Sequence, residues 1–183
     1  MSPQEYYEQK NFDEVLSLYR QGRVDLGSIE VLQVVIFSAF ETSHFNDAIL
    51  LSDRLLQTLD ADLNKDDFDL RKTIYHVLID SSHRLGINRK VVKYVIRGER
   101  FITNSAWAKP FITFANEHLQ RVYNFTAIVT ALVVFGLIAL QRMYKIFEPR
   151  SYVILMGISL IFSLFIAVFP EYAKKLIAKW IAR

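Results

Sequence analysis

The segment FTAIVTALVVFGLIAL, residues 125–140, holds sixteen residues without one charged side chain. Tyr123 and Tyr144 flank it, at the depth where aromatic side chains mark the two interfaces of a bilayer. A helix from one tyrosine to the other rises about 30 Å, at roughly 1.5 Å per residue, which matches the hydrocarbon thickness. The pattern therefore predicts a transmembrane helix over residues 122–144.

A second apolar segment, YVILMGISLIFSLFIAVF, predicts another transmembrane helix over residues 152–169. The connector 145–151 is short, so the two helices are expected to run antiparallel as a hairpin. Small residues in the second helix suit close helix–helix contact, and they are the candidate contacts of a homo- or hetero-oligomer: Gly157, Ser159 and Ser163. The alternative is a pair of buried helices in a soluble bundle, which two long uncharged stretches in succession disfavour.

Residues 170–183 predict a basic amphipathic helix at a membrane interface. Its apolar stripe comprises Tyr172, Ala173, Leu176, Ile177, Trp180 and Ile181. The opposite side is basic, a pattern typical of a helix that lies on an anionic leaflet. The candidate membrane-interface residues are therefore Lys174, Lys175, Lys179 and Trp180. Packing of this helix on the soluble domain is the alternative.

Charge is distributed unevenly along the chain. Residues 1–124 carry 15 Lys and Arg against 17 Asp and Glu, whereas residues 125–183 carry 7 against 2. The excess positive charge therefore belongs to the apolar region, and no nucleic-acid partner is expected. Basic residues near both ends of the predicted hairpin favour a topology with both termini in the cytosol. Cysteine is absent, which excludes disulfides and a catalytic thiol.

Residues 1–121 are predicted to form a soluble, all-helical domain. The whole chain has only six glycines and four prolines, and no long stretch alternates with the period of a strand. A loop is expected over residues 60–67. A last helix begins near Asn104, bends or restarts at Pro110 and runs on into the first transmembrane helix. The other helices are expected at 13–21, 28–40, 45–59, 68–85 and 88–101.

Two segments of this domain repeat the spacing of a tetratricopeptide helix pair. LQVVIFSAFETSHFNDA, residues 32–48, places large side chains in its first helix and a small one in its second helix, where the two cross. YHVLIDSSHRLGINRKV, residues 75–91, has the same order. NFDEV, residues 11–15, resembles the turn and second helix of a third, incomplete unit. The repeat makes two sets of positions equivalent, namely Phe12, Phe45 and Asn88, and Val15, Ala48 and Val91.

These repeats and the hydrophobic C-terminal region resemble the mitochondrial fission-one family of membrane adaptors over residues 28–121. LRKTIYHVLI (70–79) and KYVIRGERF (93–101) add to the resemblance. It implies a tetratricopeptide-like domain displayed to the cytosol on the mitochondrial outer membrane or on peroxisomes. There its concave face would recruit other proteins, in membrane fission or remodelling. The chain departs from the family in having two predicted spans and an amphipathic tail where the family has one span.

In repeats of this type, side chains between the core positions of the first helices face a concave groove. These positions give the candidate partner-binding residues: Glu30, Gln33, Phe37, Phe40, Thr73, His76, Asp80, His83 and Arg84. The last five lie along one helical face. Exposed phenylalanines beside polar groups would form a peptide-binding groove. The alternative is that the phenylalanines belong to the core and that the other residues form an ordinary solvated surface.

No enzyme activity, cofactor or metal site is predicted. His76, Asp80 and His83 can share one side of a helix, but the sequence supplies no further ligand. The leading hypothesis is a membrane-anchored protein-binding adaptor or scaffold. Its main alternative is an accessory structural subunit of a larger membrane complex, and another is a hairpin that bends membranes or forms a pore. The spacing of Arg71 and His76 matches that of helical HEPN ribonucleases, so a membrane-tethered ribonuclease is a minor alternative.

Overall fold

The computed structural model describes residues 2–61, 67–144 and 149–182, and every regular element within these ranges is a helix. The all-helical prediction is therefore confirmed for the described residues. The elements in chain order are α1 (Pro3–Glu8), α2 (Phe12–Arg20), α3 (Ile29–Glu41), α4 (Phe45–Ala61), α5 (Phe68–Arg84), α6 (Asn88–Ile102), the 3-10 helix η1 (Ala106–Ala108), α7 (Lys109–Tyr144), α8 (Pro149–Val168) and α9 (Pro170–Ala182).

The predicted helix boundaries agree with α2 to α6 to within two residues at each end. The prediction did not identify α1, although the sequence signals it. Ser2 and Glu5 form a capping box around the first turn, and a proline opens the helix. Pro110 lies in the first turn of α7, directly after η1. The predicted loop 60–67 and connector 145–151 fall largely outside the described residues.

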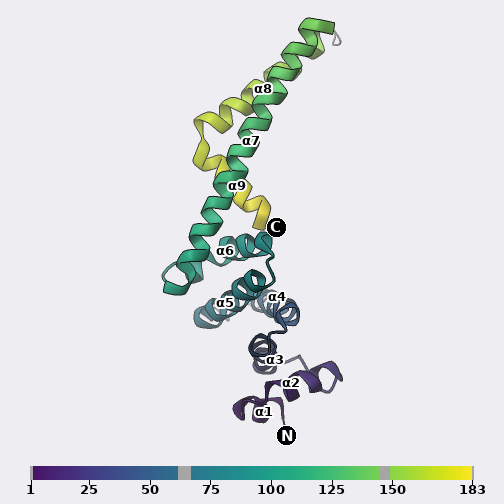
Figure 1. The fold of residues 1–183 in the computed structure, drawn as a ribbon, viewed down its shortest axis with the longest axis vertical. Coiled ribbons are helices and arrows are strands. Elements are labelled where there is room, and N and C mark those ends of the chain that lie inside the picture. The colour runs from purple at the N-terminus through teal and green to yellow at the C-terminus, as the bar shows by residue number, and fades with distance from the viewer. Residues whose placement is uncertain (1, 62–66, 145–148, 183) are drawn as a thin grey trace. The chain divides into compact units, whose positions relative to one another are not determined.

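The chain divides into two compact units, an N-terminal unit, Met1–Thr113, and a C-terminal unit, Phe114–Arg183. In the N-terminal unit, α1 to α6 are stacked in chain order (Figure 1). Each helix contacts the next along the chain, α1 also contacts α3, and α3 also contacts α5. The stack is thus a series of helix pairs, α1–α2, α3–α4 and α5–α6, whose first helices touch one another.

The same backbone turn lies between the two helices of each of the three pairs, and it also ends α2 at Gly22. Lys10, Ser43 and Gly86 take positive φ angles of 58°, 62° and 70° in the turns within the pairs. In each of these three turns the next amide donates to the carbonyl five residues before it, at 2.8 to 2.9 Å. This is the Schellman closure, which satisfies carbonyls left free at the end of a helix. The three pairs therefore share one local geometry, although only the third has glycine at the left-handed position.

The core of the N-terminal unit follows the same repeat. Val15, Ala48 and Val91, which occupy equivalent positions in α2, α4 and α6, are fully buried. The positions that the repeat marks on the first helices are buried as well: Leu32, Val35, Ile36 and Ala39 on α3, and Tyr75, Leu78, Ile79 and Ser82 on α5. The repeated spacing in the sequence is thus the spacing of the residues that pack between successive helices.

Gly98 of α6 lies against the ring of Tyr75 on α5. A Cβ atom at Gly98 would come within 2.6 Å of Tyr75 Cγ. The tyrosine ring is stacked in turn on Phe101, with 5.7 Å between the ring centroids. Glycine in a helix interior is about 1 kcal/mol less favourable than alanine. Its presence here is explained by the close approach of the two helices.

We expect Gly98→Ala to lower the free energy of unfolding by about 1–3 kcal/mol, because the added methyl group must displace a buried ring. Helix propensity alone predicts the opposite sign, a gain of about 1 kcal/mol. Chemical denaturation of the purified chain in detergent measures the change. The control is the same substitution in a Tyr75→Leu background, where the loss should shrink. An undiminished loss there would show that the ring is not its cause.

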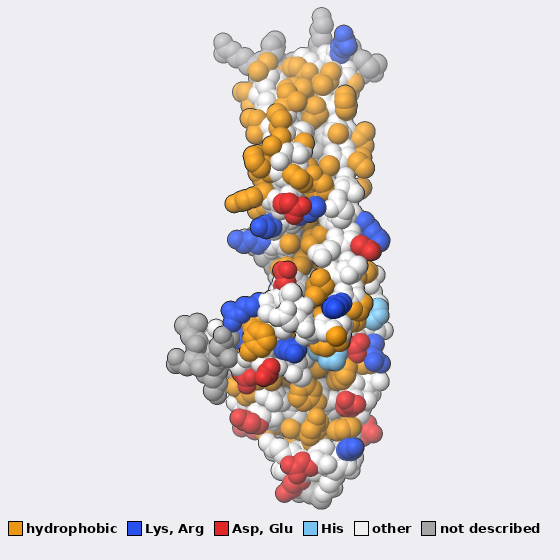
Figure 2. All heavy atoms as spheres, turned by 90° about the vertical axis from the view of Figure 1, so that its left-hand side faces the viewer, with side chains coloured by type: hydrophobic (Ala, Val, Ile, Leu, Met, Phe, Trp, Pro, Cys, Tyr) orange, Lys and Arg blue, Asp and Glu red, His pale blue; other side chains and the backbone are white. Residues whose placement is uncertain are grey.

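In α7 and α8 the chain has two helices that are long and apolar enough to cross a membrane. Only 6% of the most apolar 18-residue window of each helix is buried. A helix in the core of a soluble protein would instead be mostly buried. Figure 2 shows the consequence as a surface of hydrophobic side chains over the upper end of the view, where α7 and α8 lie. The apolar side chains of these helices are therefore available to lipid.

Contacts within the C-terminal unit join α7, α8 and α9. The Tyr123 hydroxyl of α7 donates to the carbonyl of Ile166, near the end of α8, at 2.9 Å. Lys174 of α9 places its Nζ 5.7 Å from the centre of the Tyr123 ring, in a cation–π contact. α9 also packs on α8. The start of the apolar part of α7 thus lies beside the junction of α8 and α9.

Candidate protein-binding face

Six aromatic side chains gather on the N-terminal unit, around the first helices α3 and α5. The centroids of the Phe40 and His76 rings lie 6.3 Å apart, and Trp107 of η1 packs on His76 at 4.3 Å. The ring of Phe45 lies 6.2 Å from that of Phe40. Phe111, at the start of α7, contacts His83 at 5.3 Å. We call the set the aromatic face: Phe40, Phe45, His76, His83, Trp107 and Phe111. Each of these residues is half-buried except His83, which is exposed.

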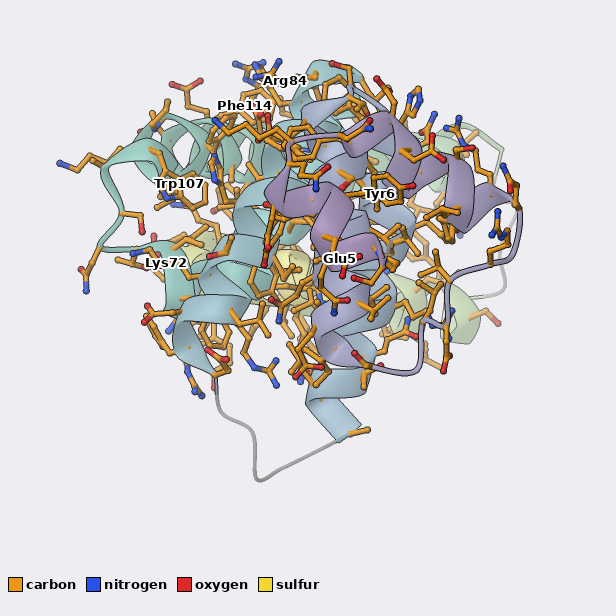
Figure 3. The ribbon with its side chains drawn as sticks, turned by 90° about the horizontal axis from the view of Figure 1, so that it is seen from below. Glu5, Tyr6, Lys72, Arg84, Trp107 and Phe114 are labelled. Carbon is orange, nitrogen blue, oxygen red and sulfur yellow. The ribbon has the colours of Figure 1, made fainter. Side chains whose placement is uncertain are left out.

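One ion pair borders the aromatic face. Arg84 Nε donates to Asp80 Oδ2 at 2.8 Å, between residues four apart on α5. The Arg84 guanidinium also lies 5.5 Å from the centre of the Phe45 ring. Arg84 is 56% exposed and Asp80 only 18%, so the cation is open to a partner while the carboxylate is largely covered. Figure 3 labels Arg84 and Trp107, which come from the end of α5 and from η1.

Burial lowers the pKa of His76 below its usual value of 6.5, and the charge of Asp80 opposes this shift. The rings of Phe40 and Trp107 exclude water from the imidazole, which disfavours its charged form. At neutral pH the ring is therefore uncharged and offers one hydrogen-bond donor and one acceptor. The aromatic face is an apolar surface with an exposed cation, Arg84, at its border.

The structure brings five of the nine predicted partner-binding residues to this face or its border: Phe40, His76, Asp80, His83 and Arg84. The other four lie elsewhere on α3 and α5. Gln33 and Phe37 are half-buried on α3. Glu30 is exposed near the start of α3 and accepts a hydrogen bond from the Ser28 hydroxyl at 2.9 Å. Thr73 is exposed, and its hydroxyl donates to the backbone carbonyl four residues before it.

Sequence reasoning did not identify three members of the aromatic face. The repeat pattern marks Phe45 only as a repeat position, and it predicts no role for Trp107 and Phe111. The last two are four residues apart at the beginning of a predicted helix, a spacing that places both side chains on one side. That spacing could have identified them as a pair. Their contact with α5 could not have been predicted, because it joins segments about thirty residues apart.

The predicted membrane-interface residues all lie on α9. Lys174 is half-buried and pairs with Glu171 at 3.0 Å. Lys175, Lys179 and Trp180 are exposed. The helix therefore presents two lysines and an indole ring at its surface.

The predicted oligomer contacts lie in α8. The Ser163 hydroxyl donates to the backbone carbonyl of Ser159 at 2.9 Å, within the helix. Apart from its chain neighbours and the backbone of its own helix, a Cβ atom at Gly157 would meet no described atom within 4 Å. The backbone at Gly157 is therefore open to approach by another helix.

Arg71 and His76, the residues of the ribonuclease alternative, have separate surroundings. Arg71 is only 9% exposed, and its guanidinium donates to the Asp60 carboxylate and to the carbonyl of Leu59. It also lies 5.7 Å from the centre of the Phe101 ring. His76 packs instead on the aromatic face. Arg71 is therefore engaged in holding α5 to the end of α4.

Among the described residues, no group of three or more His, Asp or Glu side chains is arranged to hold a metal ion. No protein-family model, curated protein or solved structure matches the chain.

Proposed function

We propose that the protein is a membrane-anchored adaptor, which displays its N-terminal unit to the cytosol and recruits other proteins through the aromatic face. The observation that carries the proposal is the aromatic face itself, with the exposed cation Arg84 at its border. Half-buried rings beside an exposed arginine are the composition that protein interfaces favour at their centres. The partner best suited to this surface is a peptide or helix with apolar side chains and a carboxylate.

The helix pairs of the N-terminal unit support a tetratricopeptide-like architecture. Contacts between successive first helices, together with the recurring turn, are features that such repeats share. In this architecture, first helices line the concave side, and three of the six residues of the aromatic face lie on the first helices α3 and α5. The resemblance to the fission-one family, and a role in membrane fission or remodelling, remain proposals.

The C-terminal unit supports the anchor. We propose that α7 and α8 cross the bilayer as an antiparallel hairpin, with α9 on the cytosolic surface beside the ends of the spans. The contact between Tyr123 and Ile166 is consistent with this topology, because it joins the start of one predicted span to the end of the other. Both termini would then be cytosolic, and the mitochondrial outer membrane or the peroxisome is the proposed location.

The test of recruitment is Arg84→Glu. We expect it to reduce retention of the partner more than tenfold in affinity purification of the full chain from detergent, followed by mass spectrometry of the retained proteins. The ion pair that it breaks joins residues four apart on one helix, and such pairs contribute only about 0.3–0.5 kcal/mol to stability, so the fold should persist.

The matched control is Arg54→Glu, which reverses the charge of an exposed residue on α4, the second helix of the pair α3–α4. The control should retain partners as the unmodified chain does. Equal retention by all three proteins would contradict the assignment of the aromatic face. Co-purification at fixed stoichiometry that neither substitution changes would instead favour the accessory-subunit alternative, with contacts through α8.

A further inference from the structure

A crevice lies within the C-terminal unit, where α7, α8 and α9 meet. Its volume is 320 Å³, within the range of roughly 300–1,000 Å³ typical of small-molecule sites. The lining residues are Val122 and Thr126 from α7, Phe162, Phe165 and Ile166 from α8, and Ala173, Leu176, Ile177 and Trp180 from α9. All three helices thus contribute to one concave surface.

The walls of this crevice are almost entirely apolar. Thr126 is the one lining residue with a hydroxyl, and that hydroxyl donates to the Val122 carbonyl at 2.8 Å within α7. Ile166 and Ala173 are buried at its base, whereas Leu176 and Trp180 are more than half exposed at its edge. An occupant must therefore be a hydrocarbon over most of its length.

Positive charge lies next to the crevice. Lys174 directly follows the lining residue Ala173, and its Nζ is held over the Tyr123 ring beside Val122. Lys175 and Lys179 are exposed on the same helix. Glu171 is the only acidic residue of α9, so the helix carries an excess of two positive charges. A ligand with a hydrocarbon part and a negative group would satisfy both features.

We propose that the crevice binds one acyl chain of a phospholipid with a net negative headgroup, and that the lysines of α9 contact this headgroup. The proposal rests on the membrane anchor proposed above. The proposed spans α7 and α8 place the crevice in the bilayer, from which an acyl chain can enter it. Trp180 and Leu176 flank the entrance. α9 would then bind selectively to a leaflet that contains anionic phospholipid, since the site requires both an acyl chain and a negative headgroup.

The experiment is native mass spectrometry of the full chain, purified in detergent and titrated with phosphatidylserine or phosphatidylcholine of the same acyl chains. We expect the unmodified protein to retain phosphatidylserine with at least fivefold preference, the factor expected for about one lysine near an anionic headgroup. Ile177→Trp, which fills the crevice, should lower phosphatidylserine retention about tenfold. Leu164→Trp, at an exposed position of α8 outside the crevice, should not.

Lys174→Gln tests the contribution of the positive charge of α9 separately from that of the shape of the crevice. It should reduce the preference for phosphatidylserine while leaving phosphatidylcholine retention unchanged, and Arg142→Gln, near the other end of α7, should change neither. Equal retention of the two lipids by the unmodified chain would overturn the proposal. So would full phosphatidylserine retention by Ile177→Trp, or a dimer that this substitution alone abolishes, since a second copy would then be the occupant.

Alkaline extraction of membranes distinguishes failure of this site from failure of the anchor. A chain that stays in the extracted membrane but shows no lipid preference contradicts only the lipid site. A chain released into the supernatant contradicts the anchor, and the lipid site with it.

Discussion

Arginine at two positions of each apolar helix, Leu132 and Phe135 of α7 and Ile158 and Ile161 of α8, is expected to release the protein from alkali-extracted membranes. These side chains lie near the middle of the apolar stretches and are 65%, 69%, 62% and 70% exposed. Replacing a large apolar residue with arginine at the centre of a transmembrane helix costs roughly 3–4 kcal/mol per position on insertion scales. Two such changes cancel about as much as the apolar residues of one helix supply, so neither α7 nor α8 should insert.

Tyr172→Arg with Leu176→Arg is the matched control. Both residues are exposed on α9, outside the two candidate spans. Arginine can extend its charge to water at an interface, so this variant should remain in the extracted membrane. The measurement is the fraction of the chain in pellet and supernatant after extraction. Retention of the four-arginine variant in the pellet would contradict the proposal that α7 and α8 cross the membrane.

Arg71→Ala is expected to lower the free energy of unfolding by about 2–4 kcal/mol. The substitution removes a buried side chain, and it leaves the carbonyl of Leu59 without its donor. It also removes the cation above Phe101, whose ring supports Tyr75 against Gly98. Several contacts between α4, α5 and α6 thus depend on one side chain.

Asp60→Asn should cost much less, about 1 kcal/mol or below, because the Asp60 side chain is 54% exposed and the carbonyl contact of Arg71 persists. Arg54→Ala, at an exposed position of α4, should change stability by no more than about 0.5 kcal/mol. Denaturant titration of the three variants in detergent ranks them. A loss for Arg71→Ala no greater than that for Arg54→Ala would show that the buried guanidinium does not stabilise the stack.

The sequence predicted the helices well because their determinants are local. Apolar periodicity and the repeated spacing at 32–48 and 75–91 placed α3 to α6, and the same positions form the core. The recurring turn was only partly visible. Glycine marks it at Gly86, whereas Lys10 and Ser43 take the same left-handed geometry without a residue type that signals it.

The aromatic face was less predictable, because it depends on which segments meet. Repeat geometry identified Phe40, His76 and His83 as positions on the first helices. It could not show that Trp107 covers His76, which decides both the shape of the surface and the lowered pKa of that histidine. The crevice in the C-terminal unit could not be predicted from the sequence for the same reason, since its walls come from three separate helices.

The stacking of helices in chain order also bears on the order of events during synthesis. Each helix of the N-terminal unit finds its contacts in the helix before it or two before it, so every loop that must close is short. The left-handed turns close each pair locally. The stack can therefore fold helix by helix during synthesis, before α7 and α8 emerge from the ribosome. On the proposed topology, the preceding unit would already be compact when the apolar helices reach the insertion machinery, and it would remain on the side where it was made.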